Sequence, residues 1–182
     1  DLLAPRGAIN FRVILDDYYA IVPEGTDPTS SELRRAYLQY VIDALIMRFN
    51  QEIAQRRDQV RQLLDERQKA GAQVSADVFL TDGRSLVAAA DARYEGLRQL
   101  EILGRTARTR LSVAKDEATR NTIMKEVQAE IASIQDETIA RLADEYEKGA
   151  VLSFYFSDQL KGIETAGFDV SNFFQDMMAS FD

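Results

Sequence analysis

The feature that most constrains the fold is a run of 42 residues, Thr29 to Ala70, that contains neither Pro nor Gly. Most of its residues favour helix, and it opens with capping-box spacing from Thr29 to Glu32. Asp27 and Pro28 supply a cap and a suitable first helical position. We therefore predict one uninterrupted helix over this run. At about 1.5 Å per residue it would be a rod of about 63 Å, so we expect an elongated molecule.

The two halves of this predicted helix differ in their apolar pattern. From Leu33 to Ile53, apolar side chains cover almost the whole circumference, which is typical of a helix buried on several sides. From Gln51 to Lys69, only a narrow apolar stripe remains beneath many charged residues. The second half is therefore expected to project as a thin, coiled-coil-like arm.

The preceding segment, Ile9 to Val22, fits two patterns. Alternating apolar residues favour a strand, while a spacing of three and four along Phe11, Leu15, Tyr18 and Val22 favours a helix. We predict a helix, because the helical pattern is longer and a lone strand would have no partner elsewhere in the chain. A loop follows from Pro23 to Pro28.

A second long helix has a strong signal from Ser85 onward, and Ser75 or Thr81 could cap it. Asp82-Gly83 marks either a kink or the true start. An apolar stripe at heptad spacing continues past Gly104 and favours a single helix as far as residue 148. Such a helix would leave much of its length uncovered, so we predict a fold-back somewhere in residues 104–121.

The third long helix is predicted to end near Lys148, at Gly149, and a short helix to follow within Val151 to Ile163. The last segment, Phe168 to Phe181, has the spacing of a cleanly amphipathic helix. One interpretation is a recognition helix that binds a partner through its apolar face. The other is that this helix closes the open end of its own bundle. The candidate partner-binding residues are Phe173, Phe174, Met177, Met178 and Phe181.

Composition excludes several kinds of chemistry. The chain has 182 residues, no Cys and no His, which removes thiolate nucleophiles, His-containing triads and the usual zinc and di-iron sites. It also has neither a phosphate-binding glycine motif nor a nucleophile elbow. We therefore predict a non-enzymatic protein with no catalytic residue, cofactor or metal, although enzymes that use only carboxylates, Lys or Ser pass this filter.

The formal net charge of -8 is uneven along the chain. Residues 29–115 are net basic and residues 116–182 strongly acidic, so we expect the last third to pack beside the middle third. A basic run could bind an anion or an acidic partner. Alternatively, it pairs with acids of the third helix such as Glu126 and Glu130. Its arginines are Arg98, Arg105, Arg108 and Arg110, and no nucleic-acid-binding motif surrounds them.

Together these features predict a single all-α domain over residues 1–182. It would be an elongated antiparallel three-helix, coiled-coil-like bundle with short terminal helices packed on it. Our leading functional hypothesis is a non-catalytic interaction or assembly module that binds a protein partner or a second copy. The alternative is a ligand-sensing receptor ectodomain in which Arg93 or Arg98 reads a small anion together with Tyr94.

Two expectations concern location. The chain contains no apolar run long enough to span a bilayer, so we predict no membrane insertion of this chain. Because the chain is acidic and no nucleic-acid-binding motif surrounds its basic run, we also predict no nucleic-acid binding. It begins at Asp1 without Met, which we interpret as a processed or excised chain. We therefore favour an extracytoplasmic location over a cytoplasmic one.

Overall fold

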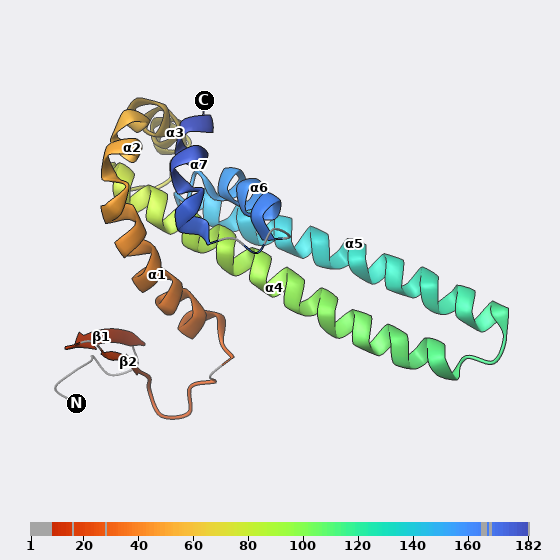
Figure 1. Cartoon of the computed structure of the whole chain (residues 1–182). Coiled ribbons are helices and arrows are strands. Elements are labelled where there is room, and N and C mark those ends of the chain that lie inside the picture. The colour runs from red at the N-terminus through yellow and green to blue at the C-terminus, as the bar shows by residue number, and fades with distance from the viewer. Residues whose placement is uncertain (1–8, 16, 28, 165–166, 168, 182) are drawn as a thin grey trace.

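A computed structural model (Figure 1) describes residues 9–15, 17–27, 29–164, 167 and 169–181. The described chain is an all-α helical bundle, as predicted, with one short β-hairpin near its N-terminus. The elements are β1 (Asn10–Ile14), β2 (Asp17–Ile21), α1 (Ser31–Arg48), α2 (Asn50–Gln55), α3 (Arg57–Lys69), α4 (Val78–Val113), α5 (Glu117–Glu147), α6 (Ser153–Glu164), the 3-10 turn η1 (Val170–Asn172) and α7 (Phe174–Ser180).

Helix α4 is the centre of the architecture. It packs against α1, α5 and α6, and its first turns also contact α2 and α3. Asp77 caps it by accepting a hydrogen bond from the Leu80 backbone N–H at 3.2 Å. The helix therefore begins between the two predicted caps, Ser75 and Thr81, and Asp82-Gly83 lies inside it as neither a kink nor a start.

The predicted fold-back between α4 and α5 is confirmed. The chain reverses at residues 114–116, where the Asp116 carboxylate accepts the Thr119 backbone N–H at 2.7 Å and caps α5. The two helices run antiparallel and project well beyond the rest of the molecule (Figure 1). The basic middle of the chain thus lies beside its acidic last third, as the charge distribution predicted. The predicted end of α5 is also confirmed, because Lys148 is its C-cap and Gly149 follows with φ +100°.

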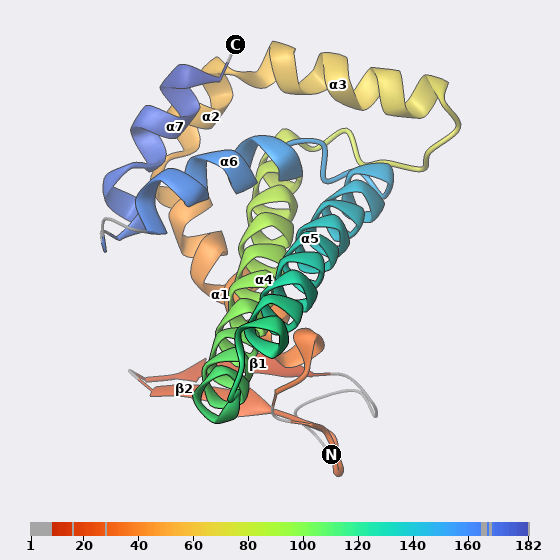
Figure 2. The same cartoon turned by 90° about the vertical axis from the view of Figure 1, so that its right-hand side faces the viewer.

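The prediction of one rod over residues 29–70 is wrong. The chain leaves helical geometry at Phe49 and at Arg56, which separates α1, α2 and α3. Both residues contact the C-terminal segment: the Phe49 ring lies 5.3 Å from that of Phe174, and Arg56 Nε donates to the Met178 carbonyl at 2.9 Å. Helix α3 consequently turns across the end of the bundle (Figure 2) and buries Val60 and Leu64 there, so it does not form the predicted arm.

The prediction of a helix over Ile9 to Val22 is also wrong. The two halves of this segment pair with each other as antiparallel strands, from Asn10 opposite Ile21 to Ile14 opposite Asp17. The partner that a lone strand would lack is therefore supplied within the same segment. Leu15 lies at the connection with φ +57°, a left-handed conformation that suits a tight reversal.

The C-terminal segment is shorter and less regular than the predicted helix over residues 168–181. Its described part forms η1 and then α7, with a change of conformation at Phe173. Among the residues that the structure describes, no helix is both long enough and apolar enough to cross a membrane.

Candidate functional site

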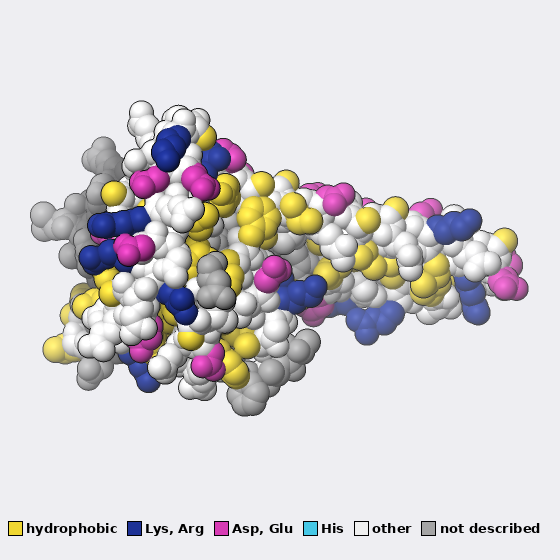
Figure 3. Space-filling view, turned by 90° about the horizontal axis from the view of Figure 1, so that it is seen from above, with side chains coloured by type: hydrophobic (Ala, Val, Ile, Leu, Met, Phe, Trp, Pro, Cys, Tyr) yellow, Lys and Arg dark blue, Asp and Glu magenta, His cyan; other side chains and the backbone are white. Residues whose placement is uncertain are grey.

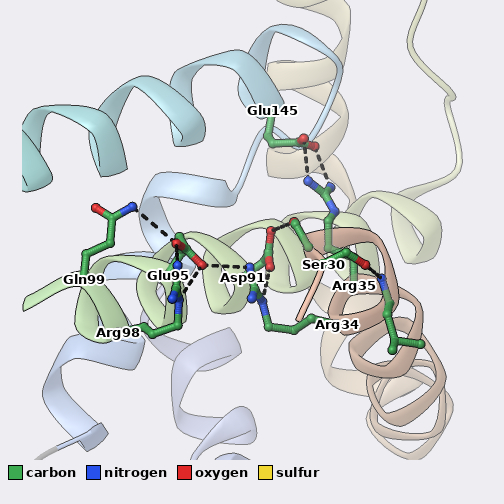
Figure 4. Close-up of polar contacts among 10 residues, drawn as sticks. Ser30, Arg34, Arg35, Asp91, Glu95, Arg98, Gln99 and Glu145 are labelled. Atoms are coloured by element: carbon green, nitrogen blue, oxygen red, sulfur yellow. Dashed lines mark hydrogen bonds and ion pairs between the residues drawn. The ribbon is translucent and has the colours of Figure 1, made fainter. Parts of the chain in front are cut away.

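A polar network joins the start of α1 to the middle of α4 (Figure 4). Arg34 Nε donates to Asp91 Oδ1 at 2.5 Å, and Ser31 Oγ donates to Asp91 Oδ2 at 2.8 Å. Glu95 accepts a hydrogen bond from Arg98 at 2.6 Å and lies 3.4 Å from Arg34. Asp91 and Glu95 are buried, so these cations compensate charges that would be costly without a partner.

A second ion pair ties α1 to α5. Arg35 binds Glu145 in a bidentate manner, at 2.7 and 2.9 Å. The hydrogen bonds from Arg35 lower the pKa of Glu145, and those from Arg98 lower the pKa of Glu95. Both acids are thereby held in their charged, hydrogen-bonded forms. The network holds α1 against α4 and α5.

The residues predicted to read a small anion are already engaged. Arg93 forms an ion pair with Glu164, and Arg98 is bound to Glu95. The Arg34 guanidinium carbon lies over the Tyr94 ring, 4.8 Å from the ring centroid. An anion would have to displace a carboxylate to reach either arginine.

The basic run does not form a single patch. Arg105 pairs with Glu101 on its own helix, and Arg108 Nε donates to the Gly104 carbonyl at 3.1 Å. Arg110 lies on another side of α4 and pairs with Glu126 of α5 at 2.5 Å. This last pair confirms the predicted contact between the basic run and Glu126.

The candidate partner-binding residues of the C-terminal segment pack inside their own chain. Phe174, Met177 and Met178 are buried in the main core, and Phe173 and Phe181 pack against it with partial exposure. The Tyr155 ring lies 4.9 Å from that of Phe181, and its hydroxyl donates to the Met177 carbonyl. This placement matches the alternative interpretation, in which the segment closes the end of its own bundle.

Asp82 is a buried acid that the sequence analysis missed. Its side chain is 0% exposed, and neither carboxylate oxygen has a hydrogen-bond partner. Burial raises the pKa of Asp82 to about 8. A signal was present, because Asp82 precedes Leu86 by four residues and Ala89 by seven, on the apolar face of the helix.

An extended apolar surface lies on the outer part of the α4–α5 hairpin, residues 97–113 and 117–139, which we call the arm. Its seam is incompletely covered, and apolar side chains run along its surface between charged ones (Figure 3). The half-buried seam residues are Leu100, Leu103, Leu111, Val127 and Ile131. The exposed apolar residues are Leu97, Ile102, Val113, Met124 and Ile139.

Two grooves follow the arm. One, of about 480 Å³, lies at its base between the hairpin and α6 and is lined by Leu97, Ile139 and Phe154 among others. The other, of about 570 Å³, lies between α4 and α5 further out and combines Ile102 and Val127 with acidic residues. The sequence analysis missed this surface because it predicted the projecting arm within residues 51–69, and an apolar stripe has the same spacing whether another helix covers it or not.

Within the described residues, no group of three or more acids is arranged to hold a metal ion. No known protein family, curated protein or solved structure matches the chain significantly. The function is therefore argued from the geometry of the arm and its base.

Proposed function

We propose that the protein is a non-catalytic interaction module whose contact surface is the arm. The observation that carries this proposal is the set of exposed apolar side chains along the arm, beside a seam between α4 and α5 that is only partly covered in places. In most helical bundles such a seam is covered by further helices. Here the other helices of the described chain gather at the end of the hairpin away from its loop at residues 114–116, which we call the base.

The energetics favour an external cover for this seam. Each apolar side chain that a partner removes from water contributes about 25 cal/mol per Å² of buried apolar area. The arm offers this area at Leu97, Ile102 and Ile139, each about half exposed. Leu97 and Ile139 line the groove at the base of the arm and Ile102 lines the outer groove, so both grooves offer apolar area to a partner.

The base is built to hold the arm in a fixed direction. Arg34 and Arg35 tie α1 to α4 and α5 respectively, and α6 packs against both helices of the hairpin. The first part of the hairpin is consequently fixed from two sides. A rigid base reduces the entropy lost when the arm binds a partner.

Site-specific photo-crosslinking in the cells that produce the protein tests this proposal. Benzoylphenylalanine replaces Leu97 or Ile139 on the arm, and in matched controls it replaces Tyr37 or Met47, which are comparably or more exposed on α1. We expect discrete adducts, with another protein or with a second copy, from the arm positions only. Equal labelling from all four positions, or none from the arm, would contradict the proposal.

A second variant checks that the adducts depend on the apolar surface. Leu97→Glu combined with Ile139→Glu changes two exposed side chains, so the melting temperature should stay close to that of the parent chain. With benzoylphenylalanine at Ile102, the double-Glu variant should give fewer adducts than the parent chain if the partner covers the base of the arm.

A further inference from the structure

The outer groove of the arm combines an apolar floor with an acidic wall. Leu103, Val127 and Ile134 form the floor, and Ile102 stands at the edge with about half of its surface exposed. Gln99 and Thr106 add uncharged polar groups on the α4 side. The groove therefore offers an apolar contact with defined polar borders.

The charge of this groove is unbalanced. Glu126, Glu130 and Glu137 line it from α5, whereas Arg110 is the single cation among its lining residues. Arg110 already pairs with Glu126. Glu130 and Glu137 are exposed and form no ion pair within the part of the chain that the structure describes. Two carboxylates beside the apolar floor are thus available to an incoming cation.

We propose that this groove binds an amphipathic helix of another protein, one that carries Lys or Arg beside its apolar stripe. This inference rests on the proposed function, because it assigns a partner chemistry to one side of the arm. A second copy that presented the same groove would bring Glu130 and Glu137 against their own counterparts. Such like-charge contact disfavours self-association through this groove.

The spacing of the acids specifies the partner further. Glu130 and Glu137 are seven residues apart, which is two helical turns or about 10.5 Å along α5. A helix lying along α5 meets both carboxylates with cations that are also seven residues apart. The groove extends from Gln99 to Arg110, about three turns, so a short helix fills it. Apolar residues between the cations then contact Ile102 and Val127.

Fluorescence anisotropy with a synthetic peptide tests this inference. The probe is an amphipathic helix of roughly four turns, with Leu at a spacing of three and four and Lys at a spacing of seven. A peptide with Glu in place of Lys is its control. We expect the Lys peptide to bind the full chain and the Glu peptide to bind at least about tenfold more weakly.

Charge variants of the protein localise the binding. Glu130→Lys combined with Glu137→Lys should weaken binding of the Lys peptide at least about tenfold. The matched control, Asp65→Lys with Glu66→Lys, makes the same change in net charge on the exposed face of α3 and should leave binding unchanged. Glu130→Gln with Glu137→Gln should also weaken binding, without introducing new cations. Circular dichroism melts verify that each variant is folded.

Several outcomes would overturn the inference while leaving the proposed function intact. Equal weakening by the α3 and α5 double variants would show a response to net charge alone. Equal binding of the Lys and Glu peptides would show that the acidic wall has no role. Adducts from Leu97 and Ile139 without peptide binding would place the partner elsewhere on the arm.

Discussion

Asp82 makes stability depend on pH in a direction opposite to that of most acids. Its ordinary pKa is 3.8, and burial raises the pKa in the folded chain to about 8. Between these values the folded chain retains a proton that the unfolded chain releases. Raising the pH therefore favours the unfolded state. The loss of unfolding free energy caused by Asp82 is absent below pH 3.8, grows between pH 3.8 and about pH 8, and is complete above about pH 8.

The size of this effect follows from the shift. Each pH unit inside the window removes about 1.4 kcal/mol from the free energy of unfolding. At pH 7 the accumulated cost is about 4 kcal/mol, and it levels off near about 6 kcal/mol above pH 8. Burial is the cause of the shift, and both carboxylate oxygens lack a hydrogen-bond partner that could offset it.

Asp82→Asn isolates this cost, because it preserves the shape of the side chain and removes its titration. Urea unfolding of the two proteins from about pH 5 to about pH 9 gives the difference in unfolding free energy. We expect Asp82→Asn to be more stable by about 2 kcal/mol near pH 5 and about 4 kcal/mol near pH 7, with a plateau above pH 8. Asp136→Asn, at an exposed position on α5, is the control for the loss of one carboxylate. A difference that stays constant with pH would refute the reasoning.

Two further pairs of substitutions test backbone and charge. Gly149→Ala should cost about 2 kcal/mol or more, because φ is +100° and the new Cβ would lie 2.7 Å from a neighbouring side-chain carbon. Gly104→Ala, in helical backbone with nothing within 4 Å, should instead stabilise by up to about 1 kcal/mol. Arg34→Met should cost about 3 kcal/mol by leaving the buried Asp91 without its cation, whereas Arg105→Met at an exposed pair should leave the melting temperature unchanged. Chemical denaturation measures each, and a Gly149→Ala chain as stable as Gly104→Ala would contradict the first pair.

Local signals were sufficient for the existence of α4 and α5 and for the end of α5. The reversal between α4 and α5 could be placed within residues 104–121, because one continuous helix would have left much of its length uncovered, and Asp116 caps α5 inside that range. Gly149 ends α5 because it adopts φ +100°, which Gly tolerates without steric cost. These features depend on residues that are close in sequence, so a pattern reveals them.

The breaks in the first helical run depend on residues that are distant in sequence. Nothing near Phe49 or Arg56 stops a helix, since the run has neither Pro nor Gly. Their departure from helical geometry coincides with contacts to residues more than 100 positions away, Phe174 and Met178. The N-terminal hairpin was missed because its apolar residues fit both a period of two and a longer helical spacing, and a strand partner within the same segment was not considered.

The same limit explains why the arm was assigned to the wrong segment. An apolar stripe such as Leu100, Leu103 and Leu111 has the same spacing whether another helix covers it or not. Helix α1 runs antiparallel to α4, with Arg34 at Asp91 and Ile46 near Gly83, so it leads away from the arm, and α3 then turns across the end of the bundle. The turn places Val60 and Leu64 in the base core, and the part of α4 beyond α6 keeps α5 as its one neighbour within the described chain. The bends at Phe49 and Arg56 therefore decide how the end of the bundle is packed, whereas the arm lies out of reach of the first helical run whether that run bends or continues.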